Sequence, residues 1–262
     1  MNRSLWIAAT GMMAQQMNVD VIANNLSNVN TTGFKKSRVN FQDLLYQTTT
    51  FGGAYSTQET QIPSGLQVGL GTKPMSTQKI FSQGDFRKTD NPYDIVIKGD
   101  GFFQVITPDG DTQYSRDGSF SANSEGILVT NEGMPLEPSI SIPSNTTKIV
   151  VGSDGTVSVL APGDVTPQQV GQITIARFSN PSGLESTGRN LYKASGSSGT
   201  PMVGTPGKEG LGTIDQGYLE NSNVDIAEEM IRMIMAQRAY EINSKAIQTA
   251  DNMMGMANNI KR

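Results

Sequence analysis

The sequence contains no cysteine and no histidine. Without cysteine the chain forms no disulfide and offers no thiolate. Without histidine it lacks the side chain that most often serves as a general acid or base and as a metal ligand. Three short turn-like segments, at residues 69–71, 99–101 and 109–111, each lack the rest of a nucleotide or calcium motif. We therefore expect no enzyme activity, no cofactor and no metal site.

Long apolar runs and a large charge excess are absent as well. No stretch approaches the roughly 18 consecutive apolar residues of a spanning helix, so we expect no direct membrane insertion. The net charge of −4 comes without a run of like charges, which argues against nucleic acid as a partner. The apolar run at residues 5–9 is too short for a secretory signal. If the chain leaves the cytoplasm, we expect a route that needs no cleaved signal peptide.

Glycine and proline are plentiful in the middle of the chain, where short β-prone runs alternate with turns. The 28 glycines and 12 prolines favour a β-rich body. The predicted strands lie at residues 94–97, 102–106, 149–151, 156–160 and 172–176. Turn signals lie at residues 99–101, 108–111, 116–118 and 153–155. This spacing predicts a mainly antiparallel domain of the sandwich or barrel type.

The N-terminal residues follow a heptad pattern typical of a helix that packs against another helix. One row, called here the N-terminal seam, alternates steps of four and three residues: Leu5, Ala9, Met12, Gln16, Val19, Ala23 and Leu26. Ala8, Gln15 and Ile22 widen it on one flank. The segment at residues 30–33 is predicted to end the helix, with Gly33 as a left-handed cap.

The C-terminal residues carry two apolar rows on one predicted helix. The C-terminal seam consists of Met235, Ala239, Ile242, Ala246, Thr249, Met253, Met256 and Ile260. The second stripe recurs every seven residues: Ile226, Met233, Tyr240, Ile247 and Met254. Ser222 followed by Asp225 predicts a capping-box start. Two rows on one helix indicate neighbours on more than one side.

These patterns predict an α+β fold in three parts. The terminal helices, within residues 1–33 and 216–262, form one discontinuous domain, and residues 74–215 form the β-rich domain. Residues 34–73 connect them. Heptad spacing alone leaves open whether the helices only close an intramolecular hairpin or also pack against other subunits. The polar stretches 46–73 and 195–210 have the composition of linkers or loops.

Four segments together resemble the flagellar rod and hook protein family. The N-terminal segment at 23–35 carries the family signature, with Ala23, Asn24, Asn25, Leu26, Asn28, Thr32, Gly33, Phe34 and Lys35 at its matching positions. Also similar to that family are residues 97–103 (IKGDGFF), 114–120 (YSRDGSF) and 217–225 (GYLENSNVD), the last continuing through 237–243 (QRAYEIN). The resemblance covers essentially the whole chain.

Within that family, the chain length and the polar stretch resemble the distal rod subunit. A segment similar to 46–73 marks distal rod subunits and is absent from typical hook proteins. We interpret it as a rod-stiffening segment that orders on assembly, anchored by Tyr46, Tyr55, Ile62, Pro63, Ser64, Gly65 and Leu66.

The resemblance implies that the terminal helices pair as a coiled coil and that the chain self-assembles. It implies a hollow helical tube that crosses the periplasm and passes torque from motor to hook. Proximal rod subunits, hook-side subunits, the surrounding rings and the type III export apparatus are the implied partners. A paralogous hook or proximal-rod subunit, or a monomeric extracellular β binding module, are the alternatives.

Overall fold

The computed structural model describes residues 3–51, 64–163 and 166–260, which divide into two compact units. Unit 1 consists of Met1–Leu26, Ser37–Gln78 and Asp225–Arg262, and unit 2 of Ser27–Lys36 and Lys79–Val224. Unit 1 contains the two terminal helices, and unit 2 contains antiparallel sheets. The predicted α+β class, with contacting terminal helices and a central antiparallel β region, is confirmed. The three-part domain division stays a prediction.

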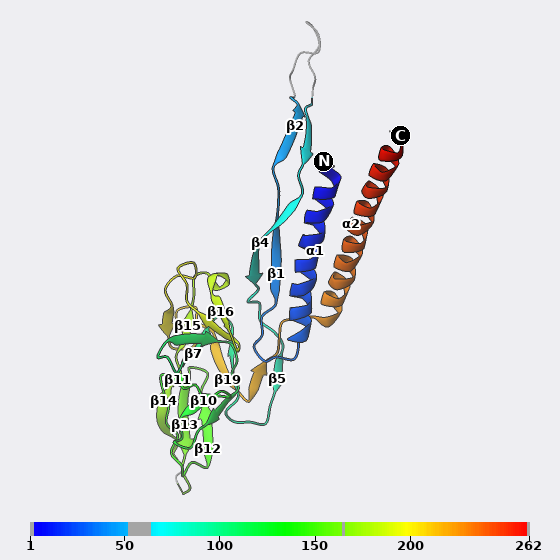
Figure 1. Cartoon of the computed structure of the whole chain (residues 1–262). Helices are drawn as coiled ribbons and strands as arrows, with labels where there is room; N and C mark the ends of the chain where they lie inside the picture. The colour runs from blue at the N-terminus through cyan, green and yellow to red at the C-terminus, as the bar shows by residue number, and fades with distance from the viewer. Residues whose placement is uncertain (1–2, 52–63, 164–165, 261–262) are drawn as a thin grey trace. The chain divides into compact units, whose positions relative to one another are not determined.

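Two helices, α1 (Arg3–Ser27) and α2 (Ile226–Ile260), form the helical part of unit 1. They pack against each other, and the start of α1 lies at the same end of the pair as the finish of α2, so the helices are antiparallel (Figure 1). Neither helix includes a segment apolar and long enough to span a bilayer.

A long β ribbon completes unit 1. Strand β1 (Ser37–Asp43) pairs with β4 (Thr72–Lys79), and β2 (Tyr46–Thr50) pairs antiparallel with β3 (Leu66–Gly69). The linker predicted from the polar composition of 46–73 is therefore wrong for the described residues. Cross-strand backbone bonds satisfy this polar segment without a large apolar content, and the Tyr46 ring covers its strand partner Gly69.

Two predicted helix boundaries need correction. Helix α1 ends at Ser27, well before Gly33. Gly33 does adopt the left-handed conformation, with φ of 69°, but its N–H donates to the backbone oxygen of Glu220 instead of capping α1. At α2 the N-cap is Asp225, because its Oδ1 accepts the N–H groups of Ala227 and Glu228. The Ser222 hydroxyl instead accepts the N–H of Val224, which lies before the helix.

Unit 2 is built from antiparallel sheets. In its seven-stranded sheet the order is β16-β17-β8-β7-β15-β18, and β11 also pairs with β7. These strands span Glu185–Gly188, Leu191–Lys193, Thr112–Ser115, Phe102–Ile106, Ile175–Arg177, Met202–Gly204 and Leu136–Glu137. A three-stranded sheet comprises β12 (Lys148–Val151), β13 (Thr156–Leu160) and β14 (Gln168–Gln172).

Three two-stranded pairs and a short 3-10 helix complete unit 2. The pairs are β5 (Phe86–Lys88) with β20 (Tyr218–Glu220), β6 (Ile95–Lys98) with β19 (Thr213–Gln216), and β9 (Phe120–Ala122) with β10 (Leu128–Thr130). The 3-10 helix is η1 (Pro181–Gly183). Strand β18 lies inside the polar stretch 195–210, so the loop prediction there is only partly right.

One apolar core joins the sheets of unit 2. It includes the fully buried side chains of Phe103, Val105, Leu136, Val157, Ile173 and Ile175. The predicted strand at 172–176 is wrong in one respect, since β14 ends at Gln172 and β15 begins at Ile175. The apolar run is continuous because Ile173 stays buried while the chain passes from one sheet to the other. Pattern alone does not mark such a crossing.

Candidate functional site

Three of the sequence motifs meet inside unit 2 at a buried group of charged side chains. We call Lys35, Arg116 and Glu220 the ionic cluster. Lys35 follows Gly33 and Phe34 of the N-terminal motif, Arg116 lies in the segment after β8, and Glu220 ends β20. Their side chains are at most 4% exposed. Charged residues this deeply buried are rare unless they are paired.

Glu220 is the centre of the ionic cluster. Its Oε1 lies 2.6 Å from Nζ of Lys35 and also accepts the N–H of Gly84 at 2.9 Å. Lys35 completes its bonding by donating to the backbone oxygen of Ser82 at 2.8 Å. The N-terminal motif, the strand before α2 and the segment ahead of β5 are therefore tied together.

Arg116 supplies the second positive charge. Its Nη1 lies 3.6 Å from Oε2 of Glu220, and its Nη2 donates to the backbone oxygen of Gly99 at 2.8 Å. The guanidinium also lies 5.4 Å from the ring centre of Phe102, a cation–π distance. Within the described part of the chain, neither Arg116 Nε nor Glu220 Oε2 has a hydrogen bond. Two cations thus share one carboxylate.

Burial governs the electrostatics of the ionic cluster. Desolvation lowers the pKa of Lys35 below its ordinary value, although the carboxylate of Glu220 opposes that shift. Desolvation also lowers the pKa of Arg116, again against Glu220. Nearby, burial of the Tyr192 hydroxyl raises its pKa. The cluster is a connection inside the fold, because its charged atoms contact one another and backbone groups.

Gly33 brings the N-terminal motif close to Arg116. A Cβ on Gly33 would lie 2.7 Å from the backbone carbon of Arg116, and the φ of 69° already disfavours any other residue. Beside it, Lys79 lies over the rings of Phe34 and Tyr192, at 5.0 and 5.6 Å from their centres. Gly33 and Phe34, the first two residues of this motif's final tripeptide, are therefore fixed by packing.

Asn223 ties together three segments that lead from unit 2 into unit 1. Its Oδ1 accepts the N–H of Lys36 at 2.7 Å, and its Nδ2 donates to the backbone oxygens of Ile80 and Ser82. Ile80 N–H in turn donates to the oxygen of Lys36. Because these backbone groups all belong to unit 2, the connecting segments are hydrogen-bonded to one another there.

Asn25 plays a comparable part inside unit 1. Its amide is 1% exposed, accepts the N–H of Ser37 and donates to the Ser37 oxygen, both at 2.9 Å. Its Nδ2 also donates to Oε2 of Glu229 at 3.1 Å. The signature asparagine therefore joins the last turns of α1, the start of β1 and the first turn of α2. Its neighbours Ala23 and Asn24 are exposed.

The predicted apolar rows of the two helices are only partly buried in the structure. The buried residues of α1 lie beside the N-terminal seam: Ala8, Ala14, Ile22 and Asn25. The apolar residues of the seam itself are half-buried, except for Ala23, which is exposed. On α2 the second stripe is turned inward at half-buried Met233, Ile247 and Met254, while Ile226 and Tyr240 stay exposed.

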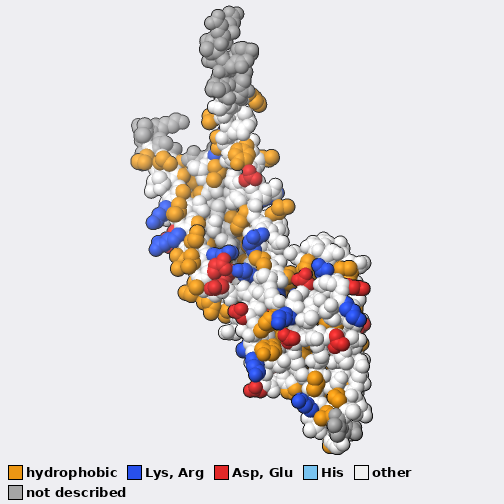
Figure 2. Space-filling model, turned by 180° about the vertical axis from the view of Figure 1, so that it is seen from behind, with side chains coloured by type: hydrophobic (Ala, Val, Ile, Leu, Met, Phe, Trp, Pro, Cys, Tyr) orange, Lys and Arg blue, Asp and Glu red, His pale blue; other side chains and the backbone are white. Residues whose placement is uncertain are grey.

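The C-terminal seam is largely exposed. Ala239 is half-buried, whereas Met235, Ile242, Ala246, Thr249, Met253 and Met256 are all exposed. In Figure 2 hydrophobic side chains, in orange, recur along the surface of the helical part. Met235 and Ala239 line a cleft with Gln15 and Asn18 of α1, and the other described side chains of this row are left exposed; the side chain of Ile260 lies outside the described residues.

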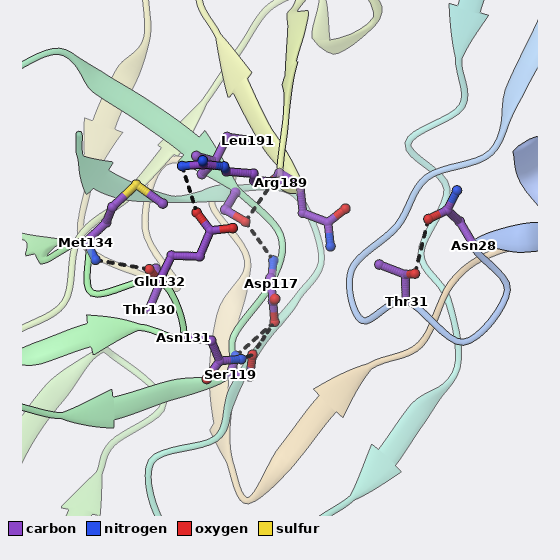
Figure 3. Close-up of a pocket in the computed structure, with 12 residues that line it drawn as sticks. Asn28, Thr31, Asp117, Ser119, Thr130, Asn131, Glu132, Met134, Arg189 and Leu191 are labelled. Carbon is purple, nitrogen blue, oxygen red and sulfur yellow. Dashed lines mark hydrogen bonds and ion pairs between the residues drawn. The ribbon is translucent and has the colours of Figure 1, made fainter. Parts of the chain in front are cut away.

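A polar cleft of about 370 Å³ lies in unit 2 (Figure 3). Asn28, Thr31, Asp117, Glu132 and Arg189 are among its lining residues. Arg189 pairs with Glu132 at 3.2 Å, and burial raises the pKa of Asp117 although Ser119 donates twice to its carboxylate. These polar groups bond mainly to each other. Among the described residues no group of three or more acids forms a metal site.

Sequence reasoning missed several of these positions. Glu229 was not singled out as a contact, although it lies seven residues before Ala236, in phase with the inward face of α2. The joint role of Arg116 and Glu220 has no local signal, because 104 residues separate them and only folding brings them together. The same holds for Asn223 and Lys36.

Comparison with known proteins agrees with this assignment of motifs. Family models match at residues 5–35 (flagella basal body rod protein), 96–159 (flagellar hook protein FlgE/F/G D1 domain) and 215–260 (flagellar basal body rod FlgEFG protein C-terminal). The chain is 54% identical over 264 residues to the flagellar basal-body rod protein FlgG of Borreliella burgdorferi, covering 100% of both chains. It is 53% identical to FlgG of Buchnera aphidicola over 96% of each chain. The FlgG of Bacillus subtilis is 40% identical over 100% of both.

The chain belongs to the FlgG family of flagellar basal-body rod proteins. It is a structural, non-enzymatic subunit of the basal-body rod, and it assembles with other basal-body proteins. The family resemblance predicted from the motifs is confirmed. The alternatives of a hook subunit and of a monomeric binding module are set aside by full-length identity to FlgG proteins.

Proposed function

We propose that this FlgG-family chain polymerises into the hollow helical tube of the distal rod and transmits torque from motor to hook. Residues 1–33 and 216–262 act as the assembly domain, with α1 and α2 in the inner layer. Copies of itself, proximal rod subunits, hook-side subunits and the surrounding rings are the proposed partners. Export follows the flagellar type III route, and the rod crosses the periplasm.

The exposed C-terminal seam is the observation that supports this proposal. Met235, Ile242 and Met253 are 66%, 67% and 52% exposed, at spacings that place them on one side of α2. Soluble monomers rarely leave a contiguous apolar row of this kind in water. Packing the row against another copy through a head-to-tail contact that does not close generates a helical polymer.

A single charge in this row tests the proposal. Burying Ile242 in an interface is worth about 1.5–3 kcal/mol, so Ile242→Glu should raise the concentration needed for polymerisation at least about tenfold. Sedimentation of the purified chain at rising concentration measures the effect, and far-UV circular dichroism checks that the fold is kept.

Gln248→Glu is the matched control, since Gln248 is exposed on the same helix but lies outside both the C-terminal seam and the second stripe. We expect it to polymerise as the unmodified chain does. Equal polymerisation of Ile242→Glu and the unmodified chain would exclude the C-terminal seam as the contact.

We further propose that the β2–β3 hairpin stiffens the rod by bracing neighbouring subunits. Tyr46 and Leu66 are 57% and 58% exposed on paired strands, beside exposed Ser64 and Gly65. The remaining predicted anchors Tyr55, Ile62 and Pro63 lie outside the described residues.

Removing residues 46–69 tests this role. Leu70 N–H already donates to the oxygen of Leu45, so a short Asn-Gly turn can close the gap. Electron microscopy of rods from the deletion should reveal curved or flexible structures. Straight, rigid rods would contradict the proposal.

The bonds inside unit 2 favour the proposed role in torque transmission. The ionic cluster and the Asn223 amide fasten the connecting segments to one another, so that a force on one segment is shared by the others. Sharing of force among the connecting segments is our proposed role for the family-motif residues that lie inside unit 2 and not on the helices.

A further inference from the structure

The inner faces of α1 and α2 meet at intervals of one heptad on each helix. A Cβ on Gly11 would lie 2.9 Å from Nδ2 of Asn243. Seven residues later Asn18 lines the same cleft as Ala236, and seven later again Asn25 bonds to Glu229. Each step forward on α1 is therefore matched by an equal step back on α2, as in an antiparallel coiled coil.

The apolar part of this contact discriminates poorly between registers. Ala236 and Ala250, which lie seven residues on either side of Asn243 on α2, are both 2% exposed. A slide of seven residues would place Ala236 or Ala250, instead of Asn243, opposite Gly11, so a small side chain faces the glycine in either shifted register. Packing alone leaves heptad-shifted pairs close in free energy.

The polar contacts do discriminate. If α2 slid by one heptad in one direction, Asn25 would face Ala236, which offers no side-chain acceptor, and the buried carboxylate of Glu229 would lose its amide donor. In the other direction Asn25 would pass beyond the first turn of α2. Either shift leaves a buried polar group unpaired, which is costly.

Asn25 is itself held firmly on the α1 side. Both of its amide atoms bond to the backbone of Ser37 at 2.9 Å, and only the remaining Nδ2 proton reaches Glu229. The pair is 1% exposed on both sides, so water does not replace the bond. A buried asparagine that fixes coiled-coil register at some cost in stability is an established device in other helices.

We propose that the Asn25–Glu229 hydrogen bond is a register lock that sets which heptads of α1 and α2 face each other. Both are positioning residues, and the lock gives every copy the same helix pair. The register concerns one chain alone, whereas its consequence for polymer geometry rests on the proposed function.

Disulfide trapping reads the register directly, because the chain has no cysteine of its own. Gly11→Cys is combined with Asn243→Cys to report the observed register, and with Ala236→Cys or Ala250→Cys to report slides of one heptad. In the full chain we expect the first pair to cross-link about 10- to 100-fold more than the others, the preference given by one hydrogen bond to a charged group.

Glu229→Met and Glu229→Gln then form a matched comparison. Both remove the negative charge, but only glutamine keeps a side-chain oxygen that accepts from Asn25. We expect Glu229→Met to cross-link the shifted pairs and Glu229→Gln to keep the observed pair. Ile22→Val, which trims a buried side chain one turn from Asn25, should lower stability and leave the pattern unchanged.

Two results would overturn the lock: an unchanged pattern in Glu229→Met, or no preference for the Gly11–Asn243 pair in the original sequence. Sedimentation of the same variants separates this from the proposed function. A chain that keeps its register and yet never polymerises argues against the assembly proposal and leaves the lock intact.

Discussion

Replacing Glu220 by glutamine is the most informative test of the ionic cluster. The substitution keeps the shape and one side-chain oxygen, but it removes the negative charge that Lys35 and Arg116 share. Both cations, at 2.6 and 3.6 Å from the carboxylate, then remain buried without it. Breaking a buried pair in this way costs about 3–5 kcal/mol.

That cost converts into a measurable shift of the unfolding midpoint. With a urea dependence of about 2 kcal/mol per molar, we expect the midpoint of unit 2 to fall by roughly 1.5–2.5 M. Near-ultraviolet circular dichroism follows the buried rings of Tyr114 and Tyr192, whereas the single tryptophan, Trp6, belongs to unit 1. The two units are thus observed separately.

Two matched variants sharpen the test. Lys35→Met leaves Glu220 with Arg116 and the N–H of Gly84, a neutral pair, so it should destabilise less than Glu220→Gln. Asp111→Asn breaks an ion pair of the same 2.6 Å length whose side chains are 49% and 54% exposed, and should scarcely move the midpoint. A Glu220→Gln midpoint as little shifted as that of Asp111→Asn would refute the reasoning.

Three further outcomes follow from the same contacts. Burial lowers the pKa of Lys35 below 10.5, so the folded chain loses this proton at a lower pH than the unfolded chain does. The free energy of unfolding, measured relative to Lys35→Met, should therefore rise with pH up to about 10.5. A difference that does not change with pH would contradict this. Gly33→Ala should destabilise more than Gly133→Ala in thermal unfolding, because both have positive φ but only Gly33 has backbone within 3 Å of the new Cβ, and equal losses would deny the close approach. Asn223→Ala should speed amide exchange of Lys36 about 2- to 13-fold, as expected for one lost hydrogen bond, and an unchanged rate would remove Asn223 from the connection.

The terminal helices were predictable because their signal is local. Heptad spacing identified α1 and α2, and the family motifs identified the residues that later proved to be buried at Asn25 and Lys35. The β ribbon at 46–50 and 66–69 was missed, since its stability comes from cross-strand backbone bonds that leave little trace in a polar sequence. Local apolar patterning likewise did not reveal that Ile173 marks a change of sheet.

The sequence indicated which residues matter at the candidate site, but it did not indicate which of them contact each other. Lys35 and Glu220 each lie in a segment that resembles the family, yet 185 positions separate them in the chain. A heptad pattern also identifies two apolar rows on α2 without saying which one faces α1. In the structure the buried row of α2 is Glu229, Ala236 and Ala250, which belongs to neither predicted row. The second stripe lies beside it and is only partly buried, and most of the C-terminal seam is exposed.

Electron cryomicroscopy of rods assembled from this chain tests the central claim most directly. The account predicts that Met235, Ile242 and Met253 of each α2 are buried against a neighbouring subunit, while Asn25 and Glu229 stay paired within each copy. Rods in which the C-terminal seam faces water, with contacts made elsewhere, would contradict it.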